Sequence, residues 1–146
     1  MIKSAHETQI TGRQSELTAI KALIDAGWEV AEPVVGEPYD LLAKSPVTDV
    51  WVQLQVKTVR KRDDRGGAAV VYATKSNGEP YSEKEVDYFV GVDGEDCYLI
   101  LNRKKREYWK PVGPVNRNKE SEWVLLNGEI TDYPAWRIER IKKEVI

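Results

Sequence analysis

The segment from Trp51 to Lys57 constrains the fold of this chain more than any other stretch of its sequence. Apolar and polar residues alternate along it, which is the period-two pattern of a β-strand with one buried face. The apolar positions point into a core and the polar positions share the opposite face, with Val52, Leu54 and Val56 on the first and Gln53, Gln55 and Lys57 on the second. The strand therefore carries an amide and an ammonium group in register on the face that points away from the core.

One acidic residue precedes this strand in a position that requires explanation. Asp40 stands directly before the apolar run at 41–43, although aspartate is depleted in strands. Turn-forming residues at 44–49 would reverse the chain, so that the two extended segments pair in antiparallel fashion. Asp40 then lies beside Gln55 and Lys57. This combination predicts a place where a metal ion and a phosphate bind.

A helix is predicted before these strands, from Thr11 to Ala26. Thr11 is suited to the N-cap and Gly27 to the C-terminal stop. Glu16 is either a first-turn glutamate favoured by the helix dipole or an acid that reaches Asp40. Apolar residues at helical spacing would form the buried stripe of this helix, namely Leu17, Ile20, Leu23, Ile24 and Ala26.

The remaining elements are predicted from turn signals and strand patterns. A short extended piece is expected over 28–31. The strand at Trp51 is expected to continue to Val59, turn through 63–67 and return over 68–74, which gives three antiparallel strands in succession. A capping box at 82–85 predicts a short helix, and apolar strands follow over 87–92 and 97–101, joined by a turn. Further signals predict a strand over 123–126, a tight turn at 127–128 and a last helix near Asp132.

The pattern of Asp40 followed by Gln55-Val56-Lys57 resembles the PD-(D/E)XK nuclease superfamily, which has an acid on one strand and acid-x-Lys on the next. Glutamine replaces the usual second acid, as in a subgroup that includes some group I intron homing endonucleases. The element order over 11–101 also resembles the αβββαβ core of that superfamily. The resemblance implies an α/β (α+β), restriction-endonuclease-like fold with a mixed central sheet flanked by helices. We expect a single domain over 1–146, with 102–146 as a C-terminal extension.

The resemblance also implies a metal-dependent DNA endonuclease of homing or restriction type, with products that carry a 5′-phosphate and a 3′-hydroxyl. Residues 12–16 resemble the Gly-x-x-x-Glu opening of such nucleases, which makes Glu16 a catalytic candidate with Asp40, Gln55 and Lys57. Asp40, Glu16 and the Val56 carbonyl would hold Mg²⁺, with Mn²⁺ as a substitute. Lys57 would orient the attacking water, and Gln55 would offer an amide oxygen to the metal or its water.

Two other functions fit the same residues. A Holliday-junction resolvase of related fold would cut branched DNA by its shape. Alternatively, the glutamine at position 55 marks a DNA-binding or assembly module that kept the nuclease fold and lost turnover. The form of the Gln-x-Lys motif favours the homing type.

Charge is arranged locally rather than globally. The formal net charge is −2, so a DNA-binding protein of this kind needs a basic surface somewhere. Two clusters offer one, unless they are merely solvated loops. The first holds Arg60, Lys61, Arg62 and Arg65, and the second holds Arg103, Lys104, Lys105 and Arg106.

Composition excludes several other classes of protein. Cys97 is the only cysteine and His6 the only histidine, so a disulfide framework, a cysteine zinc site and a Ser-His-Asp centre are not expected. No apolar run approaches membrane-spanning length, so we expect a cytoplasmic protein with no membrane partner. One site cuts one strand, so a homodimer or homotetramer is expected on duplex DNA. Trp109, Trp123 and Trp136 are either interface anchors or core residues.

Overall fold

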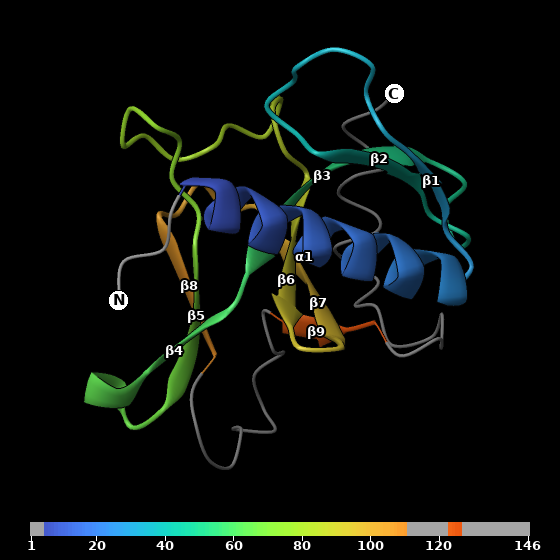
Figure 1. The fold of residues 1–146 in the computed structure, drawn as a ribbon. Helices are drawn as coiled ribbons and strands as arrows, with labels where there is room; N and C mark the ends of the chain where they lie inside the picture. Colours follow the sequence, from blue (N-terminus) through green and yellow to red (C-terminus); the bar gives the residue numbers. More distant parts are fainter. Residues whose placement is uncertain (1–4, 111–122, 127–146) are drawn as a thin grey trace.

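A helix and nine strands make up the described part of the chain. The computed structural model describes residues 5–110 and 123–126, and α1 (Ala5–Asp25) runs across one face of a sheet (Figure 1). That six-stranded sheet has the order β1-β2-β3-β6-β7-β9, with β1 Glu29–Ala31, β2 Leu41–Lys44, β3 Trp51–Thr58, β6 Tyr88–Asp93, β7 Asp96–Leu101 and β9 Trp123–Leu125. A second sheet has the order β4-β5-β8, with β4 Arg60–Arg62, β5 Ala68–Tyr72 and β8 Glu107–Lys110. A 3-10 turn, η1 (Asp63–Arg65), joins β4 to β5.

The large sheet is mixed, as expected for a restriction-endonuclease-like fold. β3 pairs antiparallel with β2 and parallel with β6, while β6 pairs antiparallel with β7. Residues alternate between buried and partly exposed along β3, which confirms the predicted strand. The predicted strands at 87–92, 97–101 and 123–126 also form, within a residue or so at their ends.

The helix differs from its prediction at its start and in its rotation. It begins at Ala5, so Thr11 is not the N-cap and instead donates its hydroxyl to the Glu7 carbonyl at 3.0 Å. The predicted stop at Gly27, with φ 88°, is confirmed. The expected stripe was wrong for Leu17 and Ile24, which are 51% and 56% exposed. The helix turns a narrower row of small residues and Leu23 towards the sheet: Ser15, Ala19, Leu23 and Ala26 are buried.

Two further elements correct the predicted order. The strand at 68–72 pairs with β4 and β8 rather than with β3, so the third antiparallel strand next to β2 is β1. The expected helix at 82–85 is a single turn, in which Ser82 donates its backbone N–H to Glu85 and accepts that of Val86. β8 had no counterpart in the prediction. In the described residues, one face of the large sheet is therefore covered by α1 and the other by the second sheet.

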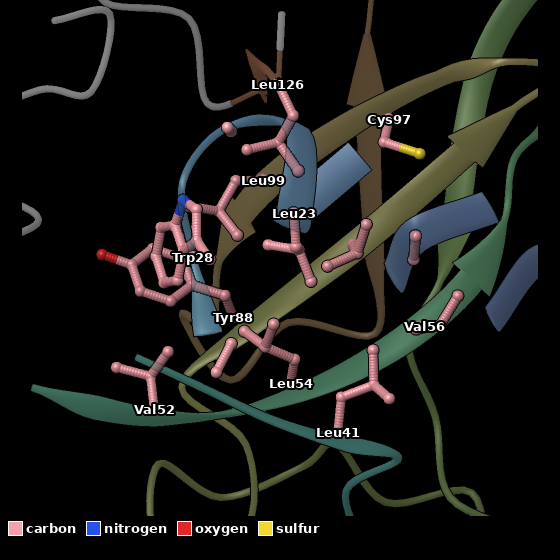
Figure 2. Packing of buried hydrophobic residues seen from close by; sticks show 14 of the residues in the cluster. Leu23, Trp28, Leu41, Val52, Leu54, Val56, Tyr88, Cys97, Leu99 and Leu126 are labelled. Atoms are coloured by element: carbon pink, nitrogen blue, oxygen red, sulfur yellow. The ribbon is translucent and has the colours of Figure 1, made fainter. Parts of the chain in front are cut away.

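Each covered face has its own hydrophobic core. Figure 2 shows the first core, where Leu23 of α1 lies among Leu54, Tyr88 and Leu99 of the sheet. The second core lies between the sheets and includes Val71, Phe89, Tyr108 and Trp123. Trp123 is 4% exposed, which makes it a core residue rather than an interface anchor. The predicted turn at 127–128, the last helix and Trp136 lie outside the described residues. None of the helices described within 5–110 is long and apolar enough to span a membrane.

Candidate active site

Asp40 lies at the point where β2 begins and where its pairing with β3 is completed by a side chain. Its backbone N–H donates to the Leu54 carbonyl at 2.8 Å, as a strand residue would. Its carboxylate oxygen Oδ2 then accepts the Val56 N–H at 2.9 Å. A carboxylate thus takes the place of the next backbone carbonyl, which explains why aspartate stands at the start of a strand.

The edge of β3 beyond Leu54 is consequently occupied by Asp40 rather than by another strand. In a strand, the N–H and C=O of one residue point towards the same neighbour. Since the Val56 N–H points to Asp40, the Val56 carbonyl points to this same edge. Asp40 lies opposite Gln55, because Leu41 pairs with Leu54 in the antiparallel register. The register therefore sets the backbones of Asp40 and Gln55 opposite each other, with Val56 next along β3.

Lys57 is half-buried on the same face of β3 as Gln55. Its ammonium lies 5.4 Å from the centre of the Tyr81 ring, which is a cation–π contact. Burial lowers the pKa of Lys57, and the nearby charge of Asp40 partly opposes this. Burial also raises the pKa of Asp40, with a contribution from Glu16, against the Val56 N–H bond and Lys57. Two neighbouring groups whose pKa values are shifted in opposite directions are typical of functional sites.

Glu16 reaches the site from α1, and an arginine holds it. A hollow of about 330 Å³ is lined by Glu16 and Asp40 together with Arg13, Glu32, Val34 and Tyr39. The Arg13 guanidinium donates to Glu16 at 2.9 Å and to Glu32 at 2.7 Å, and these carboxylates raise its pKa. Sequence reasoning missed Arg13 and Glu32. The spacing of Arg13 three residues before Glu16 is the only sign of this arrangement in the sequence.

The oxygen-bearing groups around Asp40 suit a hard cation. Among the residues described, no group of three or more histidine, cysteine, aspartate or glutamate side chains lies close enough to hold a metal ion. The Asp40 and Glu16 carboxylates line one hollow, and the register places Gln55 opposite Asp40 with the Val56 carbonyl next along β3. Mg²⁺ is commonly bound by one or two carboxylates while it keeps several waters, so the residues present fit it. Cys97 is buried, and burial raises its pKa to about 11, which disfavours the thiolate that a cysteine nucleophile requires.

The two basic clusters lie on different elements. Arg60, Lys61 and Arg62 form β4, and Arg65 ends η1, directly beyond the strand that carries Lys57. Lys61 pairs with Asp93 at 2.8 Å. The second cluster, residues 103–106, lies in the connection between β7 and β8, where Arg106 donates to the Gly78 carbonyl at 3.2 Å.

This arrangement agrees with the comparisons to known proteins. A family model described as PD-(D/E)XK endonuclease matches residues 6–122. The chain belongs to this family. The nuclease is also similar to the solved structure of a bacterial homing endonuclease, I-Ssp6803I, with a TM-score of 0.62 and 19% identity over 99% of this chain and 100% of that one. At this identity the likeness shows the fold. No curated protein matches the chain in sequence.

Proposed function

We propose that this nuclease is a Mg²⁺-dependent DNA endonuclease of the homing type, which leaves a 5′-phosphate and a 3′-hydroxyl. The observation that carries the proposal is the Asp40 carboxylate at the open edge of β3, beside Gln55, Lys57 and the Val56 carbonyl. The similar fold of a homing endonuclease favours that type over a restriction type. A single domain over 1–146 and a cytoplasmic location remain predictions.

The residues have distinct roles in this proposal. Asp40, Glu16 and the Val56 carbonyl would hold the metal ion. Bound there, Mg²⁺ would polarise the scissile phosphate and make a water more acidic. Lys57 places a positive charge where charge builds up on the phosphate, and its lowered pKa helps it to exchange a proton with the attacking water. Gln55 orients the water by its amide.

Glu16 would have two partners in turn, first the Arg13 guanidinium and then the metal ion. In the described structure the Arg13 guanidinium supplies the positive charge between Glu16 and Glu32. To bind the metal ion, Glu16 would have to give up its ion pair with Arg13. Because Arg13 is held by Glu32 as well, it remains anchored near the hollow when Glu16 turns to the site.

Cleavage of supercoiled and branched DNA, with and without Mg²⁺, tests the proposal. A homing-type enzyme linearises a plasmid that carries its target, and only with the metal present. Selective cutting of four-way junctions at symmetric positions would favour the resolvase alternative. Binding without cleavage under every metal tested, Mn²⁺ included, would identify an inactive DNA-binding protein and overturn the proposal.

Replacement of Gln55 tests whether its amide orients the attacking water or whether Gln55 is an ordinary strand residue. Gln55→Ala is expected to lower the cleavage rate by about tenfold or more, which is typical of losing one positioned group. Gln55→Glu should retain more activity, because it restores a carboxylate that binds Mg²⁺. Single-turnover rates of the two variants measure this difference. Gln53→Ala is a control on the same face of β3, since its amide bonds the Lys84 and Glu85 carbonyls instead. Equal rates for Gln55→Ala and the wild type would remove Gln55 from the site.

Cutting both strands of a duplex requires two sites, which a two-fold symmetric assembly supplies most simply. We therefore expect a homodimer or homotetramer. Light scattering on the free protein and on its complex with a cleavable duplex measures the mass directly. A monomer in both states would be inconsistent with paired sites and would favour nicking of one strand.

The DNA-binding residues in this proposal are those of the two basic clusters: Arg60, Lys61, Arg62, Arg65, Arg103, Lys104, Lys105 and Arg106. The first cluster adjoins the catalytic strand, so it contacts DNA close to the cut. Neutralising phosphates releases counterions, and affinity should therefore fall steeply with salt.

A further inference from the structure

The outer face of the second sheet carries arginines stacked on aromatic rings. Successive residues of a strand point to opposite faces, so β5 turns Ala69 and Val71 to the core between the sheets and Val70 and Tyr72 away from it. The register places Arg60 and Trp109 on either side of Val70 on that outer face. Val70 is nonetheless fully buried. We call this surface, made of Arg60, Arg62, Arg65, Tyr72 and Trp109, the arginine–aromatic face.

Three guanidinium groups meet two rings on this face. The Arg60 guanidinium lies 5.9 Å from the Tyr72 ring centre, and that of Arg65 lies 5.3 Å from the Trp109 ring centre. Arg62 lies 5.9 Å from the Trp109 centre. The rings are themselves fixed, since the Trp109 indole donates to Glu107 at 2.9 Å and the Tyr72 hydroxyl accepts a hydrogen bond from Arg62.

The three arginines differ in the hydrogen-bond partners of their guanidinium N–H groups. Arg62 is committed to the protein, because it binds both carboxylate oxygens of Asp64, at 2.8 and 2.7 Å, as well as Tyr72. Within the described part of the chain, no hydrogen bond or ion pair joins the guanidinium of Arg60 or Arg65 to another residue. Both guanidinium groups lie within cation–π distance of a ring, and both side chains are exposed to solvent. A stacked guanidinium with its edge available is prepared for a bidentate acceptor.

The shape of this part of the molecule fits a groove of duplex DNA. Figure 1 shows the hairpin of β4, η1 and β5 projecting away from β1 and β2. The major groove, about 12 Å wide, admits a two-stranded β-ribbon, and the projecting hairpin of β4 and β5 has two strands. Guanine offers two acceptors, O6 and N7, on its major-groove edge, and arginine is the commonest bidentate partner for them.

We propose that the arginine–aromatic face reads base edges in the major groove, with Arg60 and Arg65 as guanine-reading residues and Tyr72 and Trp109 as the residues that position them. This inference rests on the proposed function for its partner, duplex DNA. It adds sequence recognition to a surface otherwise assigned only to phosphate contact.

The number of residues between Lys57 and each arginine limits how far from the cut these bases lie. Arg60 follows Lys57 by three residues and Arg65 follows it by eight. At about 3.3 Å per residue, the backbone reaches at most about 10 Å and 26 Å from Lys57. The bases that Arg60 reads are therefore expected to lie nearer to the cut than those that Arg65 reads.

Selection of random duplexes by the Asp40→Asn variant, without Mg²⁺, measures this reading apart from cleavage. We expect a guanine preference of about tenfold or more at one position for each of the two arginines. Arg60→Lys and Arg65→Lys should each relax the preference at their own position and leave the salt dependence of binding unchanged, because the charge is kept. Tyr72→Leu and Trp109→Leu should relax the same positions although neither changes a charge. Lys44→Ala, on β2, removes a positive charge elsewhere and should leave every preference intact.

Three outcomes would overturn the proposal. In the first, the selected sequences show no guanine preference. In the second, the preferences persist in the lysine variants. In the third, 7-deazaguanine, which lacks N7, binds as well as guanine at those positions. The cleavage test is separate: base preference without any cleavage would end the enzymatic proposal alone, and cleavage without preference would end this one alone.

Discussion

Asp40→Asn and Lys57→Ala are each expected to lower the rate of DNA cleavage by about a thousandfold or more. Asparagine still accepts the Val56 N–H but no longer offers a charged metal ligand at the edge of β3. Alanine at position 57 removes the ammonium that stands over the Tyr81 ring and faces the Asp40 charge. Affinity for DNA should change little, because the basic clusters lie on other elements.

Asp40 and Lys57 are partly buried, so neutral replacements should affect the chemistry without destabilising the fold. The pKa of Asp40 is raised, so the stability that its protonated form contributes is present at low pH and is lost as pH rises through the folded-state pKa. The pKa of Lys57 is lowered, so the stability that its neutral form contributes is present at high pH and is lost as pH falls through the folded-state pKa. Burial therefore disfavours the charged form of each group. Neutral replacements should therefore leave the urea midpoint of unfolding at or above that of the wild type.

Single-turnover cleavage of a plasmid substrate measures the first effect, with DNA affinity measured in parallel. Asp49→Asn and Lys84→Ala are matched controls at exposed positions, and both should cleave at the wild-type rate. Either Asp40→Asn or Lys57→Ala cleaving at a rate close to the controls would refute the proposed site.

The strand pair that carries the site was the most predictable part of the fold, because its signal is local. Alternation along Trp51–Lys57 depends only on which residues are apolar, and β3 follows it. Asp40 stood out because aspartate is costly in a strand unless its carboxylate is used. Its use is now visible as the acceptor for the Val56 N–H.

The rotation of α1 could not be predicted from hydrophobicity. Leu17 and Ile24 are more apolar than Ser15, yet they face outward while Ser15 is buried. The Ser15 hydroxyl bonds that of Thr58 at 2.7 Å, and the small Ala19 lies one turn further on. Close approach of the helix to β3 selects small side chains, and a pair 43 residues apart leaves no periodic trace in the sequence.

The second sheet could not be predicted from the sequence, because it also depends on long-range pairing. β8 is a short segment with two aromatic residues between two charged ones, too short to show alternation, and β5 pairs with it across a long stretch of sequence. The same long-range pairing brings Trp109 next to Arg62 and Arg65. The sequence located the basic cluster, whereas the aromatic partners that orient it required the fold.

Asn102 carries the largest stability effect that we expect from a single side chain outside the two cores. It is 1% exposed, and its amide nitrogen donates to the carbonyls of Tyr81, Ser82 and Val86 at 3.1, 3.1 and 2.9 Å. These bonds hold the single turn that stands where a helix was predicted. The amide oxygen accepts the Lys104 N–H at 2.9 Å. One side chain thus ties the turn that carries Tyr81 to the end of β7.

Asn102→Ala is expected to lower the free energy of unfolding by about 3 kcal/mol, because it removes the buried amide donor to the carbonyls of Tyr81 and Val86. Urea unfolding followed by tryptophan fluorescence measures this loss. Asn77→Ala is the matched control, since Asn77 is exposed and accepts only the Glu79 N–H at 3.0 Å in its own turn, so about 0.5 kcal/mol is expected there. Cleavage by the folded Asn102 variant should also fall, because the turn sets the Tyr81 ring against Lys57. If the two alanine variants unfold at the same urea concentration, the amide of Asn102 does not hold the turn as its three bonds imply.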